Sequence, residues 1–239
     1  MPKQYTYGKK RGQGLGKRKK ISESEDDEHS GDEGQEQMPN IPITDLLKHI
    51  KKDVYLIDNH IYFKTDVTME SVDMLNKFMI GYYREYEILR ETYKGYEIKP
   101  RPLHLHITSD GGDLFAGLIA VDLIKSYPVP VYTVVEGKAV SAGSLIACVG
   151  HKRFMTENSY MLIHQLSSMA SGPYAHLKDE HENDTTLMDN ICKIYTDHSN
   201  KKLTKAKLAT ILQHDKYWNF ETCLKYGLVD EMSSYTFSK

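Results

Sequence analysis

Cysteine is scarce in this chain, which has 3 cysteines among 239 residues. Cys148, Cys192 and Cys223 lie far apart, and no two of them form a C-x-x-C pair or another metal-type spacing. This pattern excludes a small disulfide-stapled scaffold and a cysteine-bound metal centre. It favours a reducing, cytosol-like compartment, and we expect a cytoplasmic protein.

The chain also lacks a long uninterrupted hydrophobic run. Its most apolar stretch, residues 129–150, carries Glu136 and Lys138 near the middle, which argues against a membrane span. Residues 1–20 are basic but contain no apolar segment of the kind that a secretory signal needs. We therefore expect neither a membrane span nor a signal peptide.

The N-terminal region lacks any segment in which positive and negative charges are mixed. The charged residues of 1–20 are all Lys or Arg, and those of 21–40 are all Asp or Glu. Because both blocks are poor in apolar residues, we predict a disordered, charge-segregated tail over 1–40 and a folded domain over 41–239. The basic block could bind nucleic acid or an anionic surface, although a solvated tail without a partner, a removable segment and a gating arm stay open.

From residue 54 onward, short β-rich runs alternate with helical periodicity. Strands that alternate with helices over short connections indicate an α/β fold built from right-handed crossovers. The pattern predicts a short helix capped by Thr44, strands at 54–57 and 61–63, a helix at 68–89, a strand at 103–108, a helix at 114–126, a strand at 129–136, a helix after Ser141, strands at 153–156 and 160–163, helices at 174–198, 203–213 and 219–226, and a strand at 228–232.

The helix predicted over 174–198 differs from the others. Its apolar residues form a narrow stripe, and the rest of its surface is highly charged. A long helix of this kind is hard to bury in a small domain, so it could project and pack against another subunit. A plain surface helix that rests its stripe on its own core is the alternative.

Small residues crowd around one serine in the segment GKAVSAGSL, residues 137–145. They let the backbone turn sharply between strand and helix and expose the hydroxyl of Ser141, while the helix start offers free N–H groups to an anion. The geometry is typical of a nucleophile elbow, although Ala139 breaks the G-x-S-x-G pattern. Taken alone, the segment does not separate a catalytic serine from an ordinary turn.

Two other residues, His164 and Asp215, are candidates for either a catalytic or a structural role. His164 follows the strand predicted at 160–163, at the carboxyl end where such sheets bind ligands. Asp215 lies between two predicted helices and could be a turn or capping residue. His164 could equally be a structural histidine.

A histidine pair and a glycine pair each allow a functional and a purely structural interpretation. His104 and His106 alternate on one strand and could supply two metal ligands, but the sequence shows no third ligand at a supporting spacing. Two side chains that line a half-buried strand are the simpler interpretation. Gly111 and Gly112 could form a plain turn or bring a backbone N–H close to an anion.

Four sequence blocks, in their order and with their gaps, resemble the proteolytic subunit of the Clp protease, ClpP. They are SDGG with the later AG at 109–117, GKAVSAG at 137–143, MLIHQ at 161–165, and Asp215 followed by YGLVD at 226–230. The resemblance covers about residues 54 to 232. It implies a ClpP/crotonase-like fold of repeated β-β-α units, with the helix after His164 in the place of the projecting handle through which two rings stack.

The same resemblance implies roles for individual residues. Ser141 matches the nucleophile, His164 the general base and Asp215 the group that orients the histidine. Gly112 and Ala142 match the two backbone donors of the oxyanion hole. The implied protein is a serine endopeptidase that cleaves unfolded polypeptides without a metal or cofactor. It works inside a homo-oligomeric chamber, a heptamer or a stacked double ring, with an AAA+ unfoldase as its usual partner.

Some positions depart from the family pattern. Asp110 and Leu166 stand where the family has proline, and Asp110 puts a carboxylate close to the oxyanion region. The connection at 93–102 is typical of an insertion, and the charged tail has no family counterpart. Alternatives are a non-catalytic or specialised ring subunit, a crotonase-like acyl-CoA hydratase or isomerase, and a capsid maturation protease as a variant of the enzyme.

Overall fold

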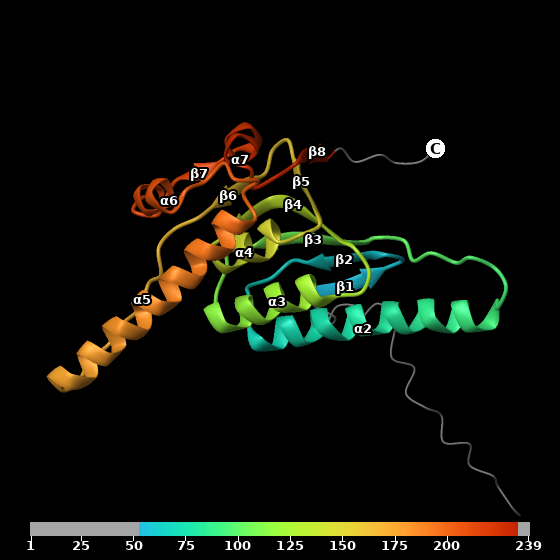
Figure 1. Ribbon diagram of the computed structural model, residues 1–239, viewed down its shortest axis with the longest axis horizontal. Helices are drawn as coiled ribbons and strands as arrows, with labels where there is room; N and C mark the ends of the chain where they lie inside the picture. The colour runs from blue at the N-terminus through green and yellow to red at the C-terminus, as the bar shows by residue number, and fades with distance from the viewer. Residues whose placement is uncertain (1–52, 234–239) are drawn as a thin grey trace, which may run out of the picture. The chain divides into compact units, whose positions relative to one another are not determined.

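The computed structural model describes residues 53–233, which form a mixed α/β fold around an eight-stranded sheet (Figure 1). The tail predicted over 1–40 and the helix predicted after Thr44 lie outside the described residues. The strands are β1 (Val54–Ile57), β2 (His60–Phe63), β3 (Leu103–Ser109), β4 (Val131–Val140), β5 (Lys152–Thr156), β6 (Tyr160–Leu162), β7 (Tyr217–Trp218) and β8 (Glu231–Ser233). The helices are α2 (Met69–Thr92), α3 (Leu114–Ser126), α4 (Ala142–Cys148), α5 (Tyr174–Asp197), α6 (Lys205–Ile211) and α7 (Phe220–Tyr226).

The sheet has the strand order β1-β2-β3-β4-β5-β8, with β6 beside the last part of β4 and β7 beside β6. β1 and β2 form an antiparallel hairpin, whereas β2, β3, β4 and β5 run parallel. Parallel neighbours need long connections, and α2, α3 and α4 provide them in turn. The alternation of strands and helices that the sequence predicts is confirmed.

One face of the sheet carries the core. Along β3 the side chains of Leu103, Leu105 and Ile107 are buried, while His104 and His106 on the opposite face are half-buried. The helices α2 and α3 lie side by side along the buried face (Figure 1). The period of two along β3 therefore divides its residues between a core face and a more open face.

Short polar side chains fix where the helices begin. Thr68 and Ser71 form a capping box at the start of α2, in which each side chain accepts from the other residue's backbone N–H. Asp113 accepts from the N–H of Ala116 at 2.7 Å and starts α3 directly after the glycine pair. These caps explain why both predicted helices begin within one residue of their predicted start.

The strand predicted at 129–136 differs most from its prediction. Ile107 pairs with Val135 but Ser109 pairs with Ala139, so β4 advances four residues where β3 advances two. The extra residues form a bulge around Gly137, whose φ is +69°. The strand therefore continues through the segment predicted as a turn and ends next to Ser141.

The C-terminal elements also differ from their predictions. α6 is shorter than the predicted 203–213, and β7 was not predicted. β8 begins at Glu231 instead of 228, because Gly227 ends α7 in the left-handed conformation and the chain then buries Leu228 and Val229 before it pairs with β5.

The long helix α5 is buried only near its C-terminal end, at Ile191, Cys192, Ile194 and Tyr195. Its N-terminal part extends away from the sheet (Figure 1), which agrees with the projecting form of the two alternatives. Within residues 53–233, the helices fall short of the length and apolar character that crossing a bilayer demands.

Candidate active site

Ser141 stands at a strained turn between β4 and α4. Its φ of 53° and ψ of −124° lie outside the regions that a side chain with a Cβ normally occupies. Its N–H donates to the carbonyl of Leu162 at 2.9 Å, which ties the turn to the end of β6. The geometry of an elbow is therefore present although the G-x-S-x-G pattern is not.

The glycine pair after β3 packs directly against this turn. A Cβ on Gly111 would lie 2.6 Å from the carbonyl oxygen of Val140 and 2.7 Å from the Cβ of Ser141. A Cβ on Gly112 would lie 2.4 Å from the carbonyl oxygen of Val67. Both residues also have positive φ angles, so only glycine fits at either position.

Two backbone donors are left free beside the serine. Among the described residues, neither the N–H of Gly112 nor that of Ala142 has a hydrogen-bond acceptor. Ala142 is the first residue of α4, where a helix leaves its N–H groups unpaired. These are the two donors that the family resemblance predicts for an oxyanion hole.

A pocket of about 330 Å³ joins these features. Ser141 and the two residues with free N–H groups line it together with His164, so four of the five predicted site residues meet there. Apolar side chains from α4 and α5 form another part of its wall. The full lining is Gly112, Asp113, Leu114, Ser141, Ala142, Leu145, His164, Gln165, Leu166, Ser167, Ile191 and Tyr195.

Asp215 does not line this pocket, and it lies just outside the pairing of β6 with β7. β6 and β7 are antiparallel, with Leu162 opposite Tyr217. His164 lies two residues after Leu162 and Asp215 two residues before Tyr217, beyond the paired residues of this ladder. Asp215 is exposed, and His164 is half-buried.

The three predicted catalytic side chains are not connected by hydrogen bonds in the part of the chain that the structure describes. Within residues 53–233, no hydrogen bond links Ser141 to His164 or His164 to Asp215. The structure thus gathers the serine, the histidine and the two N–H donors at one pocket, and Asp215 is not among its lining residues.

Asp110, which stands where the family has proline, carries its own counter-charge. Its carboxylate forms an ion pair with the ammonium group of Lys138 on β4, and the hydrogen bond between them raises the pKa of Lys138. Asp110 does not line the pocket. The carboxylate that we expected close to the oxyanion region is therefore paired with a cation and lies outside the lining of the pocket.

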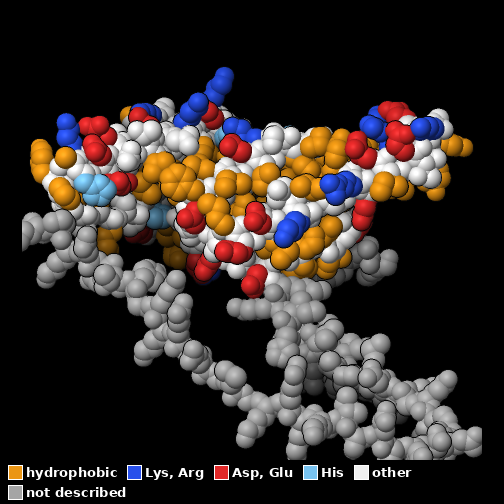
Figure 2. Space-filling model, turned by 90° about the horizontal axis from the view of Figure 1, so that it is seen from below, with side chains coloured by type: hydrophobic (Ala, Val, Ile, Leu, Met, Phe, Trp, Pro, Cys, Tyr) orange, Lys and Arg blue, Asp and Glu red, His pale blue; other side chains and the backbone are white. Residues whose placement is uncertain are grey.

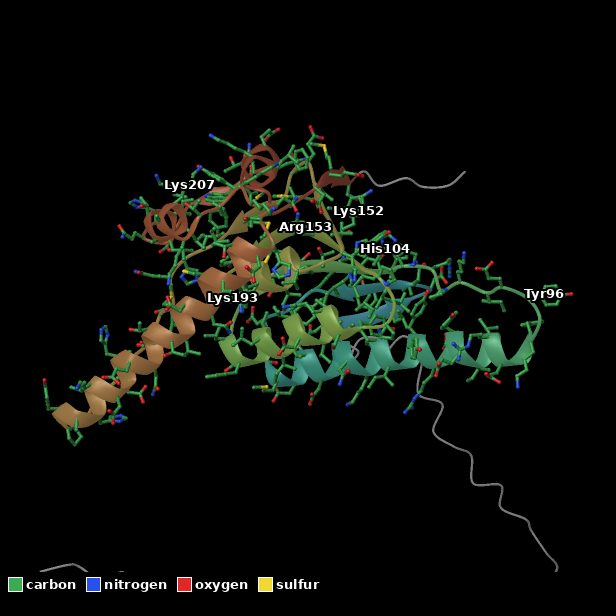
Figure 3. The ribbon with its side chains drawn as sticks, in the orientation of Figure 1. Tyr96, His104, Lys152, Arg153, Lys193 and Lys207 are labelled. Atoms are coloured by element: carbon green, nitrogen blue, oxygen red, sulfur yellow. The ribbon has the colours of Figure 1, made fainter. Side chains whose placement is uncertain are left out.

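His106 of β3 belongs to a chain of polar groups on the open face of the sheet, and the ring of His104 stacks on that of His60. His106 Nδ1 donates to Glu136 at 2.6 Å, and its Nε2 lies 2.8 Å from Nδ1 of His60. Burial lowers the pKa of His104, labelled in Figure 3, to about 4. No group of three or more His, Cys, Asp or Glu side chains within residues 53–233 is placed to hold a metal ion.

The sequence did not single out two hydroxyl groups beneath the serine turn. Ser144 and Tyr195 are both fully buried, and their oxygens lie 2.7 Å apart. Ser144 is one of several small residues in its segment, and Tyr195 belongs to the apolar stripe of α5. A serine among the apolar residues of a buried helix was the available signal.

A serine at a strained strand-to-helix turn, a glycine loop against it and a histidine at the next strand end define a class of α/β proteins with a nucleophile elbow. The Clp protease family model matches residues 95–235, more than half of the chain. The chain belongs to the Clp protease family, and its ClpP/crotonase-like fold is confirmed.

A named relative supports this assignment. The chain is similar to an ATP-dependent Clp protease proteolytic subunit of Deinococcus radiodurans, with 32% identity over 136 residues. The aligned part is 56% of this chain and 66% of the relative, so this chain spans slightly less than two thirds of the relative's length.

Proposed function

We propose that this protein is a serine endopeptidase that hydrolyses peptide bonds of unfolded polypeptides. The observation that carries the proposal is the strained Ser141 turn, which shares one pocket with His164 and two free backbone donors. Membership of the Clp protease family supports the same reaction class. The roles of the individual residues belong to the proposal.

The proposed reaction is acyl transfer followed by hydrolysis. Ser141 Oγ attacks the carbonyl carbon of the substrate while His164 accepts its proton, and the N–H groups of Gly112 and Ala142 bind the oxyanion that forms. His164 then protonates the leaving amine, and water releases the acyl group by the reverse steps. Asp215 orients His164, a role supported by their places at the same end of the antiparallel β6–β7 pair, two residues beyond it on each strand.

We further propose that copies of the chain assemble into a ring, a heptamer or a stacked double ring, which encloses the active sites. Figure 2 shows hydrophobic side chains spread over the face formed by α2 and α3. Exposed apolar surface of this kind is typical of a contact between subunits. The residues are Met69, Met74, Ile80, Ile88 and Leu89 of α2 with Phe115 and Ile119 of α3.

We also propose a partner protein and a cellular compartment for this assembly. The name of the Deinococcus relative is that of an ATP-dependent protease subunit, which supports an AAA+ unfoldase as partner here. The three described cysteines are free and buried, which fits a reducing cytoplasm.

A non-catalytic or specialised ring subunit is the second candidate. The observation that favours it is the lack of hydrogen bonds among Ser141, His164 and Asp215 in the described structure. An acyl-CoA hydratase or isomerase would use the two N–H donors without a serine nucleophile. Covalent chemistry at Ser141 separates both alternatives from a peptidase.

The test is labelling by a fluorophosphonate, read by intact mass on the native full-length protein, together with cleavage of a fluorogenic leucyl peptide. We expect one label per subunit, and in Ser141→Ala no label and a loss of cleavage by several orders of magnitude. Ser126→Ala, at the exposed end of α3, is the matched control and should retain both. Full cleavage by Ser141→Ala would overturn the proposed function, and native mass gives the ring size.

A further inference from the structure

The carbonyl oxygen of Ser141 is held by an unusual number of donors. It accepts from the N–H of Ser144 at 2.9 Å and from the N–H of Leu145 at 3.3 Å. The hydroxyl of Ser144 donates to the same oxygen at 2.6 Å. The strained residue is therefore held through its carbonyl group, and the side chain of Ser144 makes the shortest of the three contacts.

The second hydroxyl belongs to Tyr195 of α5, 51 positions further along the chain, and its oxygen lies 2.7 Å from that of Ser144. The one proton of the Ser144 hydroxyl goes to a carbonyl, which can only accept, so the phenol of Tyr195 must donate to Ser144. Burial raises the pKa of Tyr195 far above its ordinary value, so the phenol keeps its proton. The result is a directed chain from Tyr195 through Ser144 to Ser141, in which each hydrogen bond strengthens the next.

Holding this carbonyl also sets the direction of a catalytic donor. The C=O of Ser141 and the N–H of Ala142 belong to one planar trans peptide group, so they point in opposite directions. Three donors pull the carbonyl toward the buried side, which turns the N–H of Ala142 toward the pocket that it lines. A small rotation of this peptide group would move the N–H away from the oxyanion position.

We propose that Ser144 and Tyr195 are positioning residues that hold the Ser141–Ala142 peptide group and thereby aim one donor of the oxyanion hole. The inference rests on the proposed function, because it assigns a catalytic use to the N–H of Ala142. Neither side chain reacts with the substrate in this scheme, although Tyr195 also lines the pocket. Tyr195 acts only through Ser144.

The experiment compares Ser144→Ala, Tyr195→Phe and the double variant of the full-length protein by kcat, KM and the fluorophosphonate labelling rate. We expect kcat and the labelling rate to fall about tenfold in Ser144→Ala and about threefold in Tyr195→Phe, on the scale of one hydrogen bond, with KM unchanged. The double variant should equal Ser144→Ala, because Tyr195 has nothing left to act through.

Thr133→Val is the matched control. Thr133 is equally buried, and its hydroxyl donates at 2.7 Å to the carbonyl of Ala147 at the other end of α4. Its replacement should change the labelling rate less than about twofold. Equal losses in this control, or factors in the double variant that multiply, would show a general packing effect and overturn the inference.

Amide hydrogen exchange gives a readout that does not depend on activity. Exchange in a peptide covering residues 140–145 should rise in Ser144→Ala and Tyr195→Phe and stay unchanged in Thr133→Val. Unchanged exchange in the first two variants overturns the inference while the proposed function stands. If labelling of the wild type does not depend on Ser141, the proposed function fails, and exchange alone decides whether the two hydroxyls hold the turn.

Discussion

Replacing Asp230 by alanine should destabilise the fold strongly, because it leaves a buried guanidinium group without its counter-charge. Arg153 lies inside the body of the fold, beside the inner end of α5 (Figure 3). Its Nη2 and Nε donate to the two carboxylate oxygens of Asp230 at 2.6 Å and 2.9 Å. Its Nη1 donates to the backbone carbonyls of His198 and Gly227, so one side chain joins β5, α5 and α7.

The size of the loss in the free energy of unfolding follows from how exposed the side chains of Arg153 and Asp230 are. The Arg153 side chain is 6% exposed and that of Asp230 is 24% exposed. Removing one partner of a buried pair costs about 3–5 kcal/mol, and partial access of water to Asp230 favours the lower end, about 3 kcal/mol. For a domain of this size that loss corresponds to a fall in Tm of about 6–12 °C. Although burial raises the pKa of Asp230, the hydrogen bonds and charge of Arg153 lower it by more.

Urea unfolding followed by circular dichroism at fixed protein concentration measures the change. Asp58→Ala is the control, since it breaks an ion pair with Arg101 in which both side chains are more than half exposed, and its effect should be small. Asp230→Asn keeps the shape of the carboxylate but not its charge, and it should lie between the two. If Asp230→Ala costs no more than Asp58→Ala, the reasoning about the buried cation is wrong.

Two further predictions concern the glycine loop and pH. Gly111→Ala should slow labelling of Ser141 at least tenfold, because φ is +91° and the new Cβ would meet the serine turn, whereas Gly81→Ala in α2 meets nothing within 4 Å and should leave labelling unchanged. His104 takes up a proton near pH 4 when folded but near 6.5 when unfolded, so stability should be full above pH 6.5 and fall as the pH drops toward 4. The contribution of His104 to the loss should be about 1 kcal/mol after solvent screening of a half-exposed ring, and the loss derived from urea unfolding should be smaller by that amount in His104→Gln.

Most of the fold could be predicted from periodicity and caps. The helix at 114–126 has the predicted bounds, and Thr68 starts α2 as expected. The two-residue strand β7 carries too few residues for any periodic signal. The bulge in β4 depends on how β3 pairs with it, which is a tertiary contact that the local pattern does not contain.

The candidate site, like the fold, could be predicted only in part from the sequence. The sequence blocks pointed to Ser141 and His164, and the structure brings both to one pocket. The relation of Asp215 to His164 depends on how β6 pairs with β7, which is a tertiary contact that the sequence does not reveal. The bond between Ser144 and Tyr195 joins positions 51 apart and could not be predicted from local spacing.

The backbone angles of Ser141 carry a consequence for the timing of activity. A conformation of this kind costs about 1–3 kcal/mol, and it persists only where the surrounding contacts enforce it. Those contacts come from the glycine loop after β3, from β6 and α4, and through Ser144 from α5, so they extend from Gly111 to Tyr195 along the chain. A nascent or partly unfolded chain lets the serine relax, so the proposed nucleophile forms only when synthesis has passed α5 and the domain has folded. The chain would then be inert toward itself and its neighbours while it is being made.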